Sequence, residues 1–301
     1  MPPKKSFAVL GGDSRQVYLA NALAAREDGS ALYAMFLEKG SSLSKRIKQT
    51  NQVEMILPQS DVVVFPLPFL NDRGLVSTPL SEAEVSLQTC LAHLSPQAVA
   101  LAGKVPPDVH AAFRAREVAL YDYLEREEFA VLNALPTAEG AVEIALRHLP
   151  FTLFESSCLV TGYGRIGRVL ARLLGAFGAK VSVASRERSE LAWVRADGFA
   201  PVPLSHIEGC LPHADILFNT IPAVVLDGEK LSALGRRCLI IDLASGPGGV
   251  DFEAANRLGL RAVRALSLPG KVAPESAGKL TLDAIFNILD ERRGSQCQTQ
   301  P

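Results

Sequence analysis

Three glycines in the middle of the chain have a spacing suited to holding a phosphate group. Gly162, Gly164 and Gly167 show the spacing G-x-G-x-x-G, after the short apolar run 158–161 and before an apolar pattern of helical period. A strand, a tight turn and a helix in this order leave backbone N–H groups at the helix N-terminus, where the helix dipole favours an anion. Gly162 allows the turn, Gly164 the close approach of a pyrophosphate, and Gly167 the contact between helix and strand. The pattern predicts a bound dinucleotide, with contacts from Gly162, Tyr163, Gly164, Arg165, Ile166 and Gly167.

The residues about 20 positions further on indicate which dinucleotide binds. NAD-selective folds place an acidic residue there to bind the ribose 2′-hydroxyl, but this chain has Ser185 and Arg186, with Arg188 close behind. A hydroxyl and a guanidinium suit a 2′-phosphate, which arginine can hold with two hydrogen bonds. NADP is therefore favoured over NAD. Glu187 keeps NAD open as the alternative, because a small shift in register would place a carboxylate at this position.

Two later turns also follow predicted strands of the same region. The strand 216–219 runs into Asn219-Thr-Ile-Pro222, and the strand 239–242 runs into Asp242-Leu-Ala-Ser245-Gly. Ligands of open α/β sheets bind at the carboxyl ends of the strands, so these turns are expected to line the ribose and the nicotinamide. The expected cofactor contacts are Asn219, Thr220, Ile221, Pro222 and Asp242, and Ser245 is expected to contact the substrate.

A second glycine turn lies near the N-terminus. The strand 6–10 ends in Gly11-Gly-Asp-Ser-Arg-Gln16, which lacks the third glycine of a nucleotide site. We expect this turn to present Asp13 and Arg15 at the carboxyl end of a parallel strand, where a ligand would meet them. In the alternative interpretation Asp13 caps the following helix and Arg15 is solvated.

Two further segments carry polar groups in turn-like contexts. The segment 131–140 reads as a strand end, a turn and a helix that opens at Pro136 or Thr137, with Asn133, Thr137 and Glu139 facing a cleft. Capping and turn formation need the same residue types and remain the alternative. Lys271, in the turn 268–274, is a second cationic candidate beside Arg15, unless it merely caps a loop.

Composition excludes several classes of function. The 31 basic and 32 acidic residues nearly cancel, which argues against nucleic acid or an anionic membrane as the main partner. No apolar segment reaches the roughly 18 residues of a membrane span, and the N-terminus lacks the apolar core of a signal peptide. The five cysteines are scattered, without metal-binding spacing, so we expect reduced thiols, no metal and a cytoplasmic location.

The alternation of predicted strands and helices indicates the architecture. We expect an α/β protein with two Rossmann-like, doubly wound domains, a cleft between them, and a C-terminal helix that returns to the first domain. Ser81-Glu-Ala-Glu84 matches a capping box and predicts a helix start there. The predicted parts are a substrate domain 1–130, an interdomain helix 131–150, an NAD(P)-binding domain 151–272, a C-terminal helix 273–293 packing on the first domain, and a disordered tail 294–301.

Taken together, the motifs resemble the A subunit of bacterial dipicolinate synthase. The resemblance spans nearly the whole chain, with two departures, in the loop 66–74 and in the acidic run 125–128. The residues that carry it are Gly11-Gly-Asp-Ser-Arg-Gln16, Asn133-Ala-Leu-Pro-Thr-Ala-Glu-Gly140, the glycine turn 162–167, Asn219-Thr-Ile-Pro222, Asp242-Leu-Ala-Ser-Gly-Pro-Gly-Gly249 and Leu268-Pro-Gly-Lys-Val-Ala-Pro274.

The resemblance implies an NADP-dependent dehydrogenase of sporulation. It would oxidise dihydrodipicolinate, or its 4-hydroxytetrahydro precursor, to dipicolinate in the mother-cell cytoplasm, together with the flavoprotein-like B subunit of dipicolinate synthase and as a homo-oligomer. A flat dianion calls for cationic or N–H-rich ligands, for which Arg15, Asn133, Thr137 and Ser245 are the candidates. If water must also leave, Lys271, Asp13 and Glu139 are the candidate catalytic residues, and the sequence does not choose among them.

Two other functions remain open. One is another two-domain NADP-dependent dehydrogenase, of 2-hydroxyacid or shikimate type, and the other is a non-catalytic NADP-sensing module. The five histidines stand outside the glycine turns, which weighs against a 2-hydroxyacid dehydrogenase, where a histidine paired with a carboxylate takes the hydroxyl proton.

Replacing Arg186 by alanine tests the cofactor assignment. Arg186→Ala is expected to weaken NADP binding much more than NAD binding, because only NADP carries the 2′-phosphate. Calorimetric titration of both cofactors against both proteins measures the two losses. Equal losses would refute the assignment.

Overall fold

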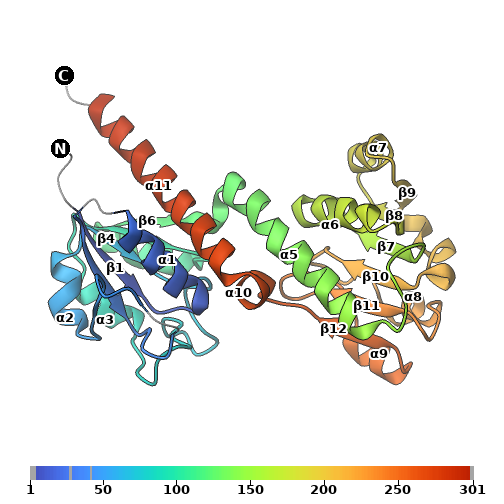
Figure 1. The fold of residues 1–301 in the computed structure, drawn as a ribbon, viewed down its shortest axis with the longest axis horizontal. Helices are drawn as coiled ribbons and strands as arrows, with labels where there is room; N and C mark the ends of the chain where they lie inside the picture. The colour runs from blue at the N-terminus through green and yellow to red at the C-terminus, as the bar shows by residue number, and fades with distance from the viewer. Residues whose placement is uncertain (1–4, 27–28, 41–42, 299–301) are drawn as a thin grey trace. The chain divides into compact units, whose positions relative to one another are not determined.

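The computed structural model describes residues 5–26, 29–40 and 43–298 (Figure 1). These residues form two compact units. The first takes its residues from the ranges Met1–Leu132 and Ala273–Pro301, and the second is Asn133–Val272. The predicted boundaries lay at 130 and 272, close to these divisions, and the roles assigned to the two parts stay predictions.

The first unit is built on a parallel sheet whose strand order is β3-β2-β1-β4-β5-β6. Its central strands are short runs of valine, alanine and leucine buried on both faces, the pattern expected when helices cover both sides of a parallel sheet. The strands are β1 (Ser6–Leu10), β2 (Ala31–Met35), β3 (Lys48–Gln49), β4 (Val62–Val64), β5 (Val99–Ala102) and β6 (Ala119–Asp122). The helices are α1 (Ser14–Ala25), α2 (Val53–Ile56), α3 (Leu87–His93), α4 (Pro107–Ala115) and α11 (Pro274–Gln298), with short 3-10 turns at Leu57–Gln59 and Tyr123–Glu125.

The second unit repeats the same arrangement, with the order β12-β11-β10-β7-β8-β9. Read from its own first strand, each sheet has the 3-2-1-4-5-6 order of a Rossmann fold. The predicted fold class is therefore confirmed. The strands are β7 (Ser157–Thr161), β8 (Lys180–Ser185), β9 (Ala200–Pro203), β10 (Ile216–Asn219), β11 (Leu239–Asp242) and β12 (Arg261–Arg264). The helices are α6 (Arg165–Ala176), α7 (Arg188–Ala196), α8 (Gly228–Ser232), α9 (Phe252–Arg257) and α10 (Leu268–Val272), with α5 (Glu127–His148) at the start and 3-10 turns at Leu204–Gly209 and Leu211–His213.

The C-terminal helix α11 packs on α1 and completes one face of the first core (Figure 1). Its side chains Leu282, Ile285 and Leu289 are buried against α1 and the sheet. The two helices approach closely at Gly278, where a Cβ atom would lie 2.6 Å from the carbonyl oxygen of Arg15. Further along, the Arg126 guanidinium donates to both carboxylate oxygens of Glu291, at 2.8 and 2.5 Å.

Two local predictions were wrong. The capping box at Ser81 starts no helix, because residues 75–86 pair with neighbouring backbone instead, as in the bond from the Val76 N–H to the Val85 carbonyl. The helix α3 begins after Ser86, whose hydroxyl accepts the Thr89 N–H at 3.0 Å. The strand end and turn expected at 131–136 are helical, since α5 starts at Glu127 and includes Pro136.

The tail was also predicted wrongly. Helix α11 continues to Gln298, because Gly294 alone does not interrupt a helix as a proline would, while residues 299–301 lie outside the described residues. The short edge strands β3, β6 and β9 were missed, since they lack a long apolar run.

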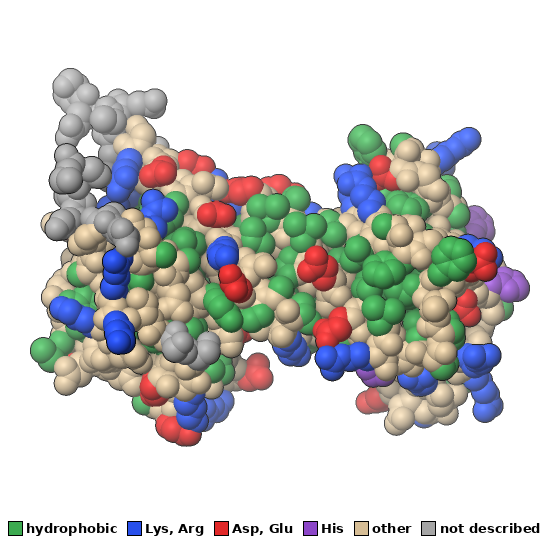
Figure 2. Space-filling view, viewed as in Figure 1, with side chains coloured by type: hydrophobic (Ala, Val, Ile, Leu, Met, Phe, Trp, Pro, Cys, Tyr) green, Lys and Arg blue, Asp and Glu red, His purple; other side chains and the backbone are tan. Residues whose placement is uncertain are grey.

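Helix α5 is long and apolar enough to cross a membrane by length and composition, although the sequence indicated no such segment. Half of its apolar window is buried inside the protein, as in the core helix of a globular protein. Basic and acidic side chains are interspersed over the face shown in Figure 2, in keeping with the net charge of −1.

The close crossing of α1 and α11 can be tested at Gly278. Gly278→Ala is expected to lower the free energy of unfolding by about 1–3 kcal/mol, because the added methyl group overpacks the contact with the α1 backbone. Urea denaturation measures the change.

The matched control is Gly294→Ala on the same helix, where no atom lies within 4 Å of the new Cβ. This control should gain about 0.5–1 kcal/mol, as is usual for glycine to alanine in a helix. Equal effects of the two substitutions would contradict the close crossing.

Candidate cofactor and substrate sites

The turn between β7 and α6 has the geometry of a phosphate site. Gly162 has φ +90°, and a Cβ atom on Gly167 would lie 2.1 Å from the Gly162 carbonyl oxygen, so strand and helix can meet only through glycine. A Cβ atom on Gly164 would have no neighbour within 4 Å, which leaves open space in front of the turn. Gly164 caps the twelve-residue helix α6 without a side-chain hydrogen bond, so the first N–H groups of the helix keep their capacity for an anion.

This turn lies at the switch point of the second sheet. Strands β7 and β10 are neighbours, and the chain proceeds from them to opposite edges of the sheet. Thr220, after β10, donates its hydroxyl to the Thr161 carbonyl at 2.8 Å and lies beside Gly162. The two turns are thereby held side by side, at the place where open α/β sheets bind their ligands.

Asn219 and Asp242 hold these turns from within. Both side chains are 0% exposed, and the Asn219 amide donates to Asp242 Oδ1 at 2.7 Å and to the Ile221 carbonyl at 3.0 Å. Asp242 also accepts the Gly249 N–H at 3.1 Å, while Asn219 Oδ1 accepts the Thr161 hydroxyl at 2.6 Å. Sequence reasoning placed both residues at the cofactor. The structure gives their side chains a positioning role, because each is fully buried and engaged with protein.

At the end of β8, the Ser185 side chain is hydrogen-bonded within the protein, whereas the sequence predicted that it contacts the cofactor. The Ser185 hydroxyl is buried, donates to the Glu190 carboxylate and accepts the Glu187 N–H at 3.1 Å. Arg186 and Arg188 are exposed, and the Arg186 side chain, 84% accessible, forms a 3.3 Å ion pair with Glu187. The groups that face solvent at this position are therefore two arginines together with the Glu187 carboxylate.

Tyr163 presents its backbone rather than its ring to the turn. Its phenol is buried and donates to Asp197, which also pairs with Arg172 at 3.1 Å. Burial, assisted by this carboxylate, raises the pKa of the Tyr163 phenol, and the same hydrogen bond lowers the pKa of Asp197. The phenol therefore stays protonated at physiological pH and fixes the helix–turn junction.

Polar groups also gather at the carboxyl end of the first sheet. Asp13 caps α1 by accepting the Arg15 N–H at 3.0 Å, and its carboxylate binds the Arg15 guanidinium at 2.9 Å. Arg15 is not solvated as the alternative interpretation expected, since it is 9% exposed and also donates to the Leu67 carbonyl. With Gln16, Tyr123 and Thr281 these residues enclose a cavity of about 10 Å³.

The remaining candidates lie in the second unit, on the part of α5 from Asn133 onward, on α10 and in the turn after β11. The Thr137 hydroxyl donates a hydrogen bond to the Asn133 carbonyl at 2.8 Å. The buried Asn133 Oδ1 atom has no hydrogen-bond partner among the described residues. A Cβ atom on Gly140 would lie 3.1 Å from Leu268, so α10 packs directly on α5. Glu139 and Lys271 are exposed on these two packed helices, as is Ser245 in the turn after β11.

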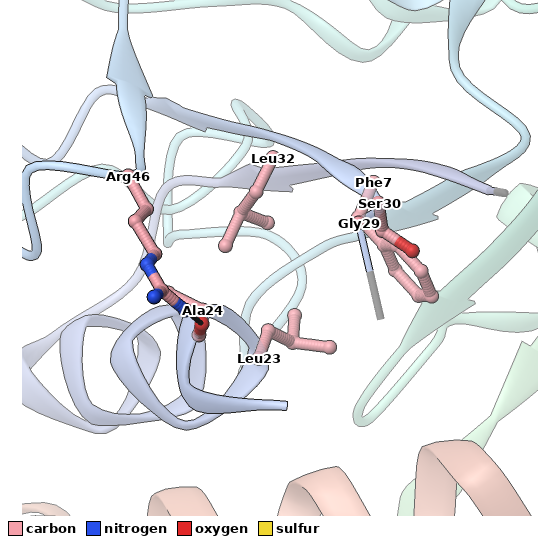
Figure 3. Close-up of a pocket in the computed structure, with 7 residues that line it drawn as sticks. All are labelled: Phe7, Leu23, Ala24, Gly29, Ser30, Leu32 and Arg46. Atoms are coloured by element: carbon pink, nitrogen blue, oxygen red, sulfur yellow. Dashed lines mark hydrogen bonds between the residues drawn. The ribbon is translucent and has the colours of Figure 1, made fainter. Parts of the chain in front are cut away.

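Two features of the first unit were not predicted. The buried Gln16, with an unpartnered Nε2, and Tyr123 both line the small cavity, and only the position of Gln16 after the glycine turn could have signalled it. A larger hollow, of about 530 Å³, opens between the starts of β1 and β2 and the end of α1 (Figure 3). Arg46 crosses it and donates to the Ala24 carbonyl at 3.3 Å. It lies at the amino ends of the strands, away from the edge where such sheets bind ligands.

Three of the described histidines contact groups other than a carboxylate, unlike the paired base of a 2-hydroxyacid dehydrogenase. His93 and His148 each place a ring nitrogen within hydrogen-bond distance of a backbone carbonyl of their own helix, and His206 lies beside a serine hydroxyl. Among the described residues, no three His, Cys, Asp or Glu side chains gather as a metal site.

Comparison with known proteins agrees with both halves of the fold. The family profile of the N-terminal domain of the dipicolinate synthase A subunit matches residues 6–124, and that of "D-isomer specific 2-hydroxyacid dehydrogenase, NAD binding domain" matches residues 137–254. A curated relative, the A subunit of dipicolinate synthase from Bacillus subtilis (strain 168), is 32% identical over 286 residues, covering 95% of this chain and 96% of the relative.

Solved structures extend the likeness to three dimensions. The dipicolinate synthase A chain from Bacillus subtilis has a TM-score of 0.87 at 31% identity, covering 98% of this chain and 99% of that one. The structure of the dipicolinate synthase A subunit from Bacillus halodurans has a TM-score of 0.86 at 29% identity, with coverage of 95% and 97%. A transhydrogenase from Sinorhizobium meliloti shares the fold alone, at 15% identity and a TM-score of 0.69, with coverage of 95% and 94%.

Substitutions of two glycines in this turn test its packing and its ligand binding separately. Gly167→Ala is expected to cost about 2–3 kcal/mol of stability, because its methyl group collides with the Gly162 carbonyl. Gly164→Ala should change stability by less than about 1 kcal/mol, since its methyl group meets open space, yet it should weaken NAD(P) binding at least tenfold by blocking the pyrophosphate. Thermal unfolding and calorimetric titration measure the two effects. Undiminished cofactor affinity in Gly164→Ala would show that the phosphate lies elsewhere.

Proposed function

Because the chain belongs to the family of dipicolinate synthase A subunits, we propose that it is the NADP-dependent subunit that oxidises dihydrodipicolinate, or its 4-hydroxytetrahydro precursor, to dipicolinate. The family expected from the motifs is confirmed, and so is the expected class of enzyme, an NAD(P)-dependent oxidoreductase. The observation that carries the proposal is the glycine turn of α6, open at Gly164, at the switch point of a Rossmann sheet.

The choice of NADP rests on the charges after β8. The predicted ligands Arg186 and Arg188 are exposed cations, and the Ser185 hydroxyl helps to fix their loop through Glu190. A guanidinium binds a phosphate with two hydrogen bonds, so these arginines suit a 2′-phosphate. Glu187 offers the carboxylate that would bind the ribose 2′-hydroxyl of NAD. Its ion pair with Arg186 makes this carboxylate less available as a hydrogen-bond acceptor for the ribose.

The proposed reaction removes two electrons and makes the ring aromatic. When bound, the nicotinamide supplies the hydride acceptor, so that dihydrodipicolinate and NADP⁺ give dipicolinate, NADPH and one proton. The chain's task is then to hold a flat diacid in line for transfer, which is catalysis by positioning. We propose Arg15, Asn133, Thr137 and Ser245 as its ligands, with the Arg15 guanidinium as the charged donor among them.

A proton must also leave, and the hydrated precursor must first lose water. Asp13 is already engaged by Arg15 and by its capping bond, whereas Lys271 and Glu139 are exposed. We therefore rank Lys271 and Glu139 above Asp13 as the general acid or base. General acid–base catalysis contributes about 10²–10⁴-fold to a rate, which sets the size of the effect to look for.

The proposal includes the setting of the reaction. The relative from Bacillus subtilis is named as an A subunit, which supports a complex with the corresponding B subunit. We propose further that the reaction belongs to sporulation and takes place in the mother-cell cytoplasm, as the motif resemblance implies. A homo-oligomer of this chain belongs to the same proposal.

Turnover tests the proposed function. The chain with NADP and dihydrodipicolinate, or its 4-hydroxytetrahydro precursor, is expected to form NADPH and dipicolinate in equal amounts. Turnover with NAD should be lower, and both reactions are followed at the nicotinamide absorbance band. Lys271→Met should lower kcat about 10²-fold while leaving NADP affinity unchanged, because an acid–base group acts only in the chemical step. Lys279→Met is the matched control, because this exposed lysine of α11 is ion-paired only with Glu275, at 2.6 Å, and its loss should leave the rate unchanged.

The other outcomes identify the alternatives. Turnover of a 2-hydroxy acid in place of the precursor would assign the chain to a different dehydrogenase. NADP binding without turnover, with or without the B subunit, would contradict the enzyme proposed and favour an NADP-sensing module.

A further inference from the structure

Gln16 is a buried side chain with an unused hydrogen-bond donor. It lies in the first turn of α1, is 4% exposed, and its Nε2 atom has no partner among the described residues. Gly12, with φ +93°, makes room for it, since a Cβ atom there would lie 2.3 Å from Gln16 Cγ. The backbone of the glycine turn is thus shaped around this amide.

Such a group is costly in the free protein. More than about nine in ten buried polar groups are paired, and an unpaired buried donor costs about 1–3 kcal/mol. Leucine or methionine at this position would fill the space without that cost. A side chain that lowers stability without a visible partner is expected where a ligand supplies the partner.

The other polar groups that line the cavity are already hydrogen-bonded within the protein. Asp13 accepts from Arg15, and the Leu67 carbonyl accepts from the same guanidinium. Thr281 donates to its own helix at 2.9 Å, and the Tyr123 phenol donates to the Phe65 carbonyl over a long 3.3 Å. Burial raises the pKa of Tyr123, so its hydroxyl keeps its proton. Gln16 Nε2 is therefore the donor at this cavity to which the described residues supply no acceptor.

The size of the cavity limits what the acceptor can be. Its volume of about 10 Å³ holds a single oxygen-sized atom, equivalent to one water molecule. It lies where β1, β4 and β6 end, at the ligand-binding edge of the sheet, and the Arg15 charge beside it is offset by Asp13. One oxygen of a carboxylate fits this space.

We propose that Gln16 Nε2 donates a hydrogen bond to one carboxylate oxygen of the substrate and that Gln16 thereby selects for the acid. This inference rests on the proposed function, because the carboxylate is that of the proposed diacid. Gln16 supplies a neutral donor beside the internally neutralised Asp13–Arg15 pair. A site built to pair with a substrate oxygen rejects analogues that lack it, since the buried donor is then left unsatisfied.

Calorimetric titration of dipicolinate into the NADP-loaded protein tests the inference. Gln16→Met keeps the length of the side chain without the donor and is expected to raise the dissociation constant of dipicolinate about tenfold. The melting temperature of the free variant should stay the same or rise, because an unpaired buried amide has been removed. Gln16→Leu provides a second variant with the same expectation.

Gln59→Met is the matched control. The exposed Gln59 donates to the Met55 carbonyl at 2.8 Å, so the substitution also removes an amide but at a site away from the cavity. Its affinity for dipicolinate should equal that of the unmodified chain.

Each remaining outcome decides between the inference and the proposed function. If the unmodified chain binds dipicolinate and both Gln16 variants bind it equally well, the inference fails and the proposed function stands. If the Gln16 variants melt at a lower temperature with unchanged affinity, Gln16 is a structural residue and the inference is overturned. If the unmodified chain binds NADP but no dipicolinate, the proposed substrate is wrong and the inference falls with it.

Discussion

The contact between Gly167 and the Gly162 carbonyl is the constraint on which the second unit depends. Because no side chain stands between α6 and β7, the helix starts directly above the strand and its dipole points at the space in front of Gly164. The buried Asn219–Asp242 pair then fixes the two neighbouring turns relative to that helix. A fully paired polar network of this kind is rigid, so the cofactor would meet a surface that is already in place.

The two sheets share one strand order but end in different chemistry. After the first strand of the second unit the chain turns through three glycines, which keeps the helix N-terminus bare for a phosphate. After the first strand of the first unit it continues into Asp13, which caps the helix, and Arg15, which lies folded against it. A capped terminus with an internal ion pair is a poor phosphate site, but it suits a ligand recognised by a few directed hydrogen bonds. The same strand order thus carries two differently built helix N-termini.

The sequence was informative where a residue type has only one structural use. The glycine spacing and the apolar strands each predicted their element, because close backbone approach and burial on two faces leave few alternatives. The capping-box pattern at Ser81 and the turn at Pro136 were misread, since both depend on tertiary contacts that overrule local preference. The roles of Ser185, Asn219 and Asp242 could not be derived either. A buried hydrogen bond needs two partners, and only the fold brings those partners together.

The place of α11 in the first core has a consequence for how the chain is made. Leu282, Ile285 and Leu289 complete the core around α1, yet they are synthesised after the whole second unit. The second unit is one continuous segment and can condense as it leaves the ribosome, whereas the first must wait with an apolar face uncovered until its last helix arrives. The contact between α1 and α11 closes a loop that contains the whole second unit. The entropy cost of closing a loop increases only slowly with its length, so the long separation slows folding of the first unit more than it lowers its stability. During synthesis, the apolar face of the first unit that α11 later covers is therefore the surface that a chaperone could bind.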